Sequence, residues 1–198
     1  MMNQELFGIT PPKKLFVKLA IPSLVSMLFS SIYMMVDGMF VGKVIGSKGL
    51  AAINLVFPII MIVFAVSDMI AAGASVKIGI KLGEKKEKDA SNIFSITILL
   101  MLIINSIFMI LSLVFAKDII FILIKDKELA TLSYRFAYVF ILALPIIAPF
   151  FALDNYLRLC GKANMSMWIN IAVSILNIIL DAILIGYFKL GIEYAALC

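Results

Sequence analysis

Five long runs of apolar residues, separated by short polar breaks, dominate the 198-residue chain. Each run reaches or exceeds the ~20 residues that a helix needs to cross a bilayer. The runs are continuous and do not alternate between apolar and polar positions, which argues against strands. They cover roughly residues 15–41, 50–76, 90–115, 132–157 and 163–187, and a sixth begins around residue 192. The pattern predicts an all-α, polytopic membrane protein forming one transmembrane lobe over residues 1–198, with five complete helices and the start of a sixth.

The break between the third and fourth runs, residues 116–129 (AKDIIFILIKDKEL), differs from the others. Its apolar core is too short to span a membrane, so we expect it to lie at the interface. Composition supports a lipid environment for the rest: 64% of the residues are hydrophobic and the mean hydropathy is +1.13. Soluble domains stay near 45–50% apolar.

Basic residues gather in the polar breaks, where they act as topology signals. The net charge is +5, from 17 Lys and Arg against 12 Asp and Glu. In alternating topology, the side that holds the N-terminus carries more of the basic residues, including the dense cluster at 77–88. We therefore expect a cytoplasmic N-terminus and no binding of nucleic acid. A lipid-headgroup site at this cluster is the alternative to a simple positive-inside loop.

The chain offers little for enzymatic chemistry. It has no histidine, and its two cysteines, Cys160 and Cys198, show no metal-binding spacing. This excludes the usual zinc sites and every Ser-His or Cys-His catalytic pair, so we expect no enzyme and no catalytic residues. The polar N-terminus lacks a signal-peptide cleavage site, and the first run is expected to remain as a helix.

Two aspartates lie within the apolar runs, and each has a polar residue four positions earlier. Asp37 follows Tyr33 in the first run, and Asp181 follows Asn177 in the fifth. Residues at this spacing share one face of a helix. Because the first and fifth helices run in the same direction, the two acids are expected at similar depth. An acid at membrane depth is expensive to maintain and is usually functional.

Such a pair can take up and release protons, or hold Na⁺ when ionised. We predict ion or proton coupling at Asp37, Asp181, Asn177 and Tyr33, with Na⁺ at Asp37, Asn177 and Asp181 as the one metal to consider. Either acid could instead cap or hydrate a helix end. An intramembrane aspartyl protease is disfavoured, because neither acid carries the expected flanking signature.

Two further acids lie toward the cytoplasmic ends of their helices. Asp154 is one turn before Arg158, which favours an i,i+4 ion pair over a functional role. Asp68 has no evident partner in its own helix, and both a cavity-lining role and a pair with a neighbouring helix stay open. Pro22 lies inside the first run, where a missing backbone N–H permits a bend.

Three stretches together resemble the N-terminal half of multidrug and toxic compound extrusion (MATE) transporters. They are KLAIPSLVSMLFSSIYMMVDGMFVGKVIGSKGLAAINLVFP, AAGASVKIGIKLGEKKEKDA and NYLRLCGKANMSMWINIAVSILNIILDAILIG, and the resemblance covers nearly the whole chain. The resemblance implies a six-helix lobe of a twelve-helix antiporter, from the bacterial and archaeal branch with its ion site in this lobe. It also implies that Pro22 is where the first helix bends as protonation changes.

The implied function is efflux of amphipathic organic cations in exchange for H⁺ or Na⁺ across a bacterial cytoplasmic (inner) membrane, with no other cofactor. Many relatives have two asparagines where this chain has Asp154 and Asn155, and the sequence ends just short of an expected threonine. A C-terminal lobe or a second copy is therefore expected to be needed for transport. The alternatives are a flippase for lipid-linked precursors, which the acids disfavour, and an inactive half-transporter.

Overall fold

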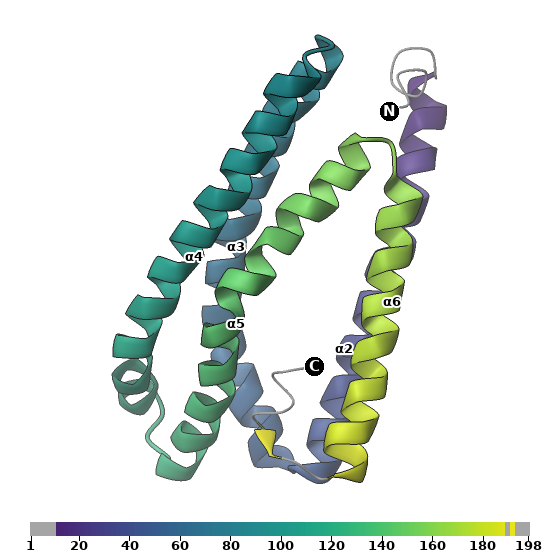
Figure 1. Ribbon diagram of the computed structural model, residues 1–198. Helices are drawn as coiled ribbons and strands as arrows, with labels where there is room; N and C mark the ends of the chain where they lie inside the picture. The colour runs from purple at the N-terminus through teal and green to yellow at the C-terminus, as the bar shows by residue number, and fades with distance from the viewer. Residues whose placement is uncertain (1–10, 189–190, 193–198) are drawn as a thin grey trace.

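The computed structural model describes residues 11–188 and 191–192, and these residues form helices connected by short turns (Figure 1). The elements in chain order are α2 Pro12–Val44, α3 Ser47–Gly83, α4 Glu87–Leu123, α5 Lys127–Leu159, α6 Ala163–Asp181 and the π-helix η1 Ala182–Tyr187. No strand occurs among the described residues. The predicted all-α membrane fold is confirmed.

The helices extend beyond the apolar runs from which they were predicted. A polar residue at the membrane edge does not end a helix, because the backbone bonds within the helix remain satisfied in water. Residues 116–123 continue α4 through Lys117 and Asp118 to Leu123. The interfacial position expected for residues 116–129 stays a prediction. The predicted sixth run, from residue 192 onward, lies outside the described residues apart from residue 192 itself.

Asp126 starts the next helix. Its side chain accepts hydrogen bonds from the backbone N–H groups of Glu128 (2.9 Å) and Leu129 (3.3 Å). These are donors that the first turn of a helix otherwise leaves unpaired. The turn between α2 and α3 depends instead on Gly46, whose φ of 89° is a conformation that side chains with a Cβ rarely adopt.

The helices form two groups that meet at their ends (Figure 1). α3, α4 and α5 pack on one another, whereas α2 packs along α6. α5 belongs to both groups: it starts between α3 and α4, then bends and reaches the start of α6 (Figure 1). Pro145 and Pro149 lie inside α5, and each removes a helical hydrogen bond, which accounts for the bend.

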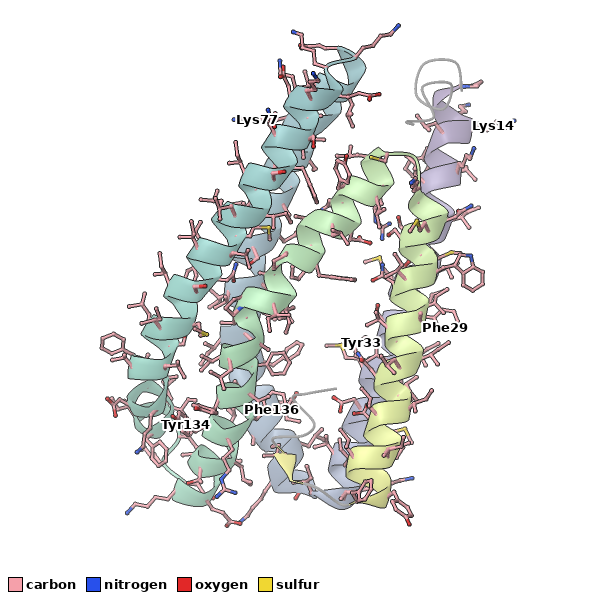
Figure 2. The ribbon with its side chains drawn as sticks, viewed as in Figure 1. Lys14, Phe29, Tyr33, Lys77, Tyr134 and Phe136 are labelled. Atoms are coloured by element: carbon pink, nitrogen blue, oxygen red, sulfur yellow. The ribbon has the colours of Figure 1, made fainter. Side chains whose placement is uncertain are left out.

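The N-terminal end of α2, the α3–α4 turn and the α5–α6 turn lie at the same end of the bundle (Figure 1). Lys14 and Lys77 are near this end (Figure 2). The helices therefore alternate in direction as the charge count assumed, and α2 and α6 run parallel.

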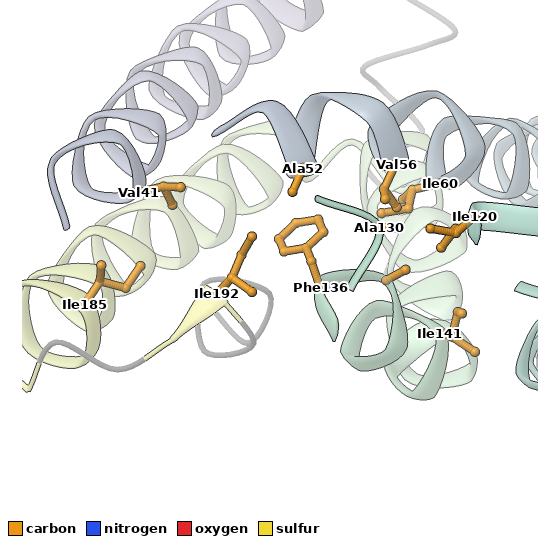
Figure 3. Packing of buried hydrophobic residues seen from close by; sticks show 11 residues of the cluster. Val41, Ala52, Val56, Ile60, Ile120, Ala130, Phe136, Ile141, Ile185 and Ile192 are labelled. Carbon is orange, nitrogen blue, oxygen red and sulfur yellow. The ribbon is translucent and has the colours of Figure 1, made fainter. Parts of the chain in front are cut away.

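The largest buried apolar cluster lies at the opposite end and joins the two groups (Figure 3). Val41 of α2 and Ile185 of η1 belong to the same cluster as Ala52 and Val56 of α3 and Phe136 of α5. All five are less than 5% exposed. This packing fixes the end of α2 that carries Asp37 relative to the end of α6 that carries Asp181.

Large apolar side chains cover much of the outer surface. Met35 is 71% exposed, Ile122 79% and Ile146 81%. Within residues 11–188, five helices are long and apolar enough to cross a membrane. Lipid, and not water, is the solvent that this surface fits.

Candidate functional site in the α2–α6 pair

The predicted site residues come from two parallel helices that pack side by side. Tyr33 and Asp37 lie on α2, whereas Asn177 and Asp181 lie on α6. Figure 2 shows Tyr33 on the side of this pair that faces α5. The i,i+4 spacing places Tyr33 and Asp37 on one face of α2, and Asn177 and Asp181 on one face of α6.

The two carboxyl groups are brought together at the interface of α2 and α6. Asp181 is 1% exposed. Asp37 is half-buried, and its Oδ1 atom is shielded from solvent without a hydrogen-bond partner among the described residues. Asp37 and Asp181 are close enough for the charge of each to act on the other, and both charges act on the Tyr33 hydroxyl.

Asn177 lies half-buried on α6, one turn before Asp181. The structure thus brings three of the four predicted residues into one electrostatic group and places the fourth on an adjacent turn. The role of each residue in ion coupling stays a prediction.

The helix carrying Asp181 changes its hydrogen-bonding pattern at that residue. α6 ends at Asp181, and the π-helix η1 starts at Ala182. Short π segments are rare and are frequently found at functional sites. Gly186 lets η1 approach α2 closely, because a Cβ there would lie 3.2 Å from Cε1 of Phe40. Nothing in the apolar sequence LDAILIGY distinguishes a π turn from an ordinary α turn, so sequence analysis missed this feature.

A second polar cluster lies nearer the end of the bundle that holds the N-terminus. The predicted ion pair of Asp154 and Arg158 is confirmed, with 2.9 Å between Arg158 Nε and Asp154 Oδ2. The other oxygen, Asp154 Oδ1, accepts hydrogen bonds from Ser166 and Asn170 of α6, the second at 3.0 Å. The guanidinium group also donates through Nη1 to Ser23 of α2. Three helices therefore meet at this ion pair.

Asp68 is exposed on α3, and no ion pair joins it to a basic residue within residues 11–188. Pro22 is buried inside α2, and its carbonyl accepts a hydrogen bond from the Ser26 hydroxyl at 3.0 Å. The bend of α2 at Pro22 stays a prediction.

Among the described residues, acidic clusters and cavities elsewhere in the bundle offer no stronger candidate for an ion site. No group of three or more His, Cys, Asp or Glu side chains that could hold a metal ion occurs among the described residues. A cavity of about 320 Å³ between α3, α4 and α5 is lined by apolar side chains and one serine, with no ionisable group. The described part of the α2–α6 pair, where two acids meet, holds no such group of three either, and an ion site between these helices stays a prediction.

Comparisons with known proteins agree with this architecture. The MatE family model matches residues 22–183. The multidrug export protein MepA of Staphylococcus aureus (strain NCTC 8325 / PS 47) is 30% identical over 191 residues, which are 96% of this chain and 42% of that protein. A solved structure described as MATE in the straight conformation superposes with a TM-score of 0.88 at 30% identity, covering 98% of this chain and 42% of that one. One described as the bent conformation gives 0.85 at 29% identity, covering 95% and 42%. The chain thus spans less than half the length of these relatives.

Proposed function

Since the chain belongs to the MATE family of multidrug efflux transporters, we propose that it forms the lobe in which ion binding drives export. The proposed reaction exchanges an amphipathic organic cation for H⁺ or Na⁺ across a bacterial cytoplasmic membrane, with the N-terminus on the cytoplasmic side. The greater number of basic residues at the N-terminal end supports this orientation.

The observation that carries the proposal is the meeting of Asp37 and Asp181 between α2 and α6. Two carboxylates that are held together away from water repel each other, so both cannot remain charged and empty without a penalty. A proton, or Na⁺ with oxygen ligands from the two acids and Asn177, removes that repulsion. Occupancy by an ion therefore changes how favourably α2 and α6 pack in this region.

An ion can drive transport only if it binds one conformation of the lobe better than another. Pro22 supplies a weak point in α2, because its ring interrupts the backbone hydrogen bonds of the helix. The existence of relatives described as straight and bent supports a change in shape. In the proposed cycle, ion binding at Asp37 and Asp181 favours one shape of α2, and the cation to be exported is released as the ion enters.

Transport also requires a second lobe, because alternating access needs two bodies that move against each other around a central site. A further part of the same polypeptide or a second copy of this chain could supply that lobe. The relatives, of which this chain spans about two fifths, support the first arrangement.

The test is dye efflux by cells that express the full-length protein, with Asp37→Asn and Asp181→Asn variants. Each amide keeps the size of the carboxyl group but can neither bind a proton nor carry a charge. We expect ion-driven efflux to fall at least about tenfold in each variant. Asp68→Asn is the matched control, since Asp68 is an exposed acid on a membrane helix, and it should leave efflux unchanged.

Normal ion-driven efflux by both site variants would remove these acids from the mechanism. Comparing efflux driven by a proton gradient with efflux driven by a Na⁺ gradient then identifies the coupling ion.

A further inference from the structure

The polar cluster around Asp154 links the moving helix of the proposed mechanism to the rest of the lobe. We call it the three-helix cluster; it comprises Ser23 of α2, Asp154 and Arg158 of α5, and Ser166 and Asn170 of α6. Most of its contacts cross between helices; the exceptions are the Asp154–Arg158 pair within α5 and the hydrogen bond from Asn170 Nδ2 to the Ser166 carbonyl (2.9 Å) within α6. The cluster lies on the N-terminal side of the α2–α6 pair, away from Asp37 and Asp181.

Ser23 is the next residue after Pro22, at the weak point of α2. Because proline has no N–H, the carbonyl of Lys18 lacks its usual helical partner. The Ser23 hydroxyl donates to the Leu19 carbonyl at 3.0 Å, so its oxygen is left to accept a hydrogen bond from Arg158. The Arg158 guanidinium therefore holds α2 at the residue that adjoins the interrupted turn.

The position of Arg158 is itself fixed by Asp154. Arg158 Nε donates to Asp154, and Asp154 accepts hydrogen bonds from Ser166 and Asn170 of α6. A guanidinium group is a rigid planar fork, so fixing one nitrogen fixes the direction of the others. A continuous chain of hydrogen bonds thus runs from α6, the helix that carries Asp181, to the weak point of α2.

We propose that Arg158 is a positioning residue. By its hydrogen bond to Ser23, the residue that follows Pro22, it favours the shape of α2 seen here. A bend of α2 at Pro22 must move Ser23 away from Arg158 or carry Arg158, Asp154 and the start of α6 with it. The contact thereby sets the balance between the shapes of α2. The inference rests on the proposed function in one respect, namely that α2 changes shape during transport.

The experiment measures the shape of α2 directly. Spin labels are attached to cysteines introduced at Lys14, before Pro22, and at Lys162, at the start of α6; both positions are exposed. All native cysteines of the full-length protein, Cys160 and Cys198 among them, are replaced by serine in every sample. Pulsed electron paramagnetic resonance of the full-length protein in lipid nanodiscs then gives the populations of label-to-label distances.

Arg158→Gln should reduce the population of the distance found in the parent protein, relative to other distances, by about tenfold. Ser23→Ala should do the same, because it removes the acceptor of the same hydrogen bond. Arg158→Lys should resemble Ser23→Ala, since an ammonium group can pair with Asp154 but does not reproduce the fork that also reaches Ser23. The matched control is Ser31→Ala, which removes another serine of α2 whose hydroxyl donates to a carbonyl of its own helix, that of Met27.

The double variant Arg158→Gln with Ser23→Ala should match either single variant, because both remove one shared contact. Unchanged distances in Arg158→Gln would overturn the inference, and so would fully additive effects in the double variant. A lower melting temperature with unchanged distances would show a purely structural role, which also overturns it.

Failure of this inference is distinguishable from failure of the proposed function. Changed distances in Arg158→Gln together with normal ion-driven efflux in Asp37→Asn and Asp181→Asn would leave the positioning role intact and remove the ion site. Unchanged distances in Arg158→Gln together with loss of ion-driven efflux in Asp37→Asn and Asp181→Asn would keep the ion site and remove the positioning role.

Discussion

The α2–α6 pair and the α3–α4–α5 group both enclose polar side chains, but Asp37 in the pair and Asn105 in the group differ in their hydrogen bonds. In the group, Asn105 of α4 is fully buried, accepts a hydrogen bond from Ser67 of α3 at 3.1 Å and donates to the Met101 carbonyl at 2.9 Å. Ser133 of α5 donates to the Ala52 carbonyl of α3 at 3.4 Å. In the pair, Asp37 Oδ1 is shielded from solvent and has no such partner within the described residues.

The two residues therefore illustrate two kinds of enclosed polar group: one whose hydrogen bonds hold helices together, and one with an oxygen that is available to a ligand. A buried amide with its partners in place contributes to helix association in a membrane. A shielded carboxylate oxygen without a partner lowers stability, and it persists in a structure when something else requires it. The Asn105 region therefore serves packing, whereas the Asp37 region fits the ion site proposed above.

The largest expected effect is a gain in stability from Asp37→Asn, a substitution that should also abolish ion coupling. Asp37→Asn should raise the melting temperature of the purified protein at pH 8 by about 4–8 °C, which corresponds to about 2 kcal/mol for a chain of this size. The amide removes the repulsion from Asp181 and can donate a hydrogen bond to it. A thermal-shift assay in detergent measures the change.

The gain should shrink at pH 5, because the carboxyl group of the parent protein is then itself closer to the neutral form. Asp68→Asn again serves as the control, and its melting temperature should equal that of the parent at both values of pH. A fall in melting temperature for Asp37→Asn would show that the carboxylate stabilises the fold, and the contrast between the two regions would be lost.

A smaller effect of opposite sign is expected in the α3–α4–α5 group. Asn105→Ala removes the bond between α3 and α4 and leaves a small cavity, so it should lower the stability by about 1–2 kcal/mol. Ion-driven efflux, corrected for the amount of protein in the membrane, should stay normal. Ser67→Ala tests the same bond from the other side and should destabilise the protein less, since it removes less volume. Loss of efflux in a stable Asn105→Ala variant would place Asn105 in the transport machinery.

The sequence identified the features that depend on neighbours within one helix. Tyr33 with Asp37, and Asp154 with Arg158, are pairs at i,i+4 spacing, and the helical period alone places each pair on one face. The membrane fold followed from the length of the apolar runs. The ends of the helices did not follow from the ends of the runs. Lys117 and Asp118 indicate a membrane edge, yet α4 continues past them.

Features that depend on the register between helices could not be predicted in the same way. Ser23, Ser166 and Asn170 meet at the Asp154–Arg158 pair only because α2, α5 and α6 cross at one level. No sequence spacing encodes that crossing. The π turn after Asp181 was equally hidden, because the same apolar residues suit both kinds of helix.

The smallest effect is expected for charges near water, at the turn between α3 and α4. Glu84 pairs with Lys81 and Lys86, both at 3.0 Å, and these lysines hold the pKa of its carboxyl group below the usual range. A lowered pKa in the folded protein gives a contribution that is present at neutral pH and is lost as the pH falls through that pKa. Because water and salt screen such pairs, Glu84→Gln should leave the melting temperature at pH 7 within experimental error of the parent. A clear loss of stability at pH 7 that disappears in acid would show that charges outside the membrane matter here as much as the buried ones, and the division between exposed and buried polar groups would have to be redrawn.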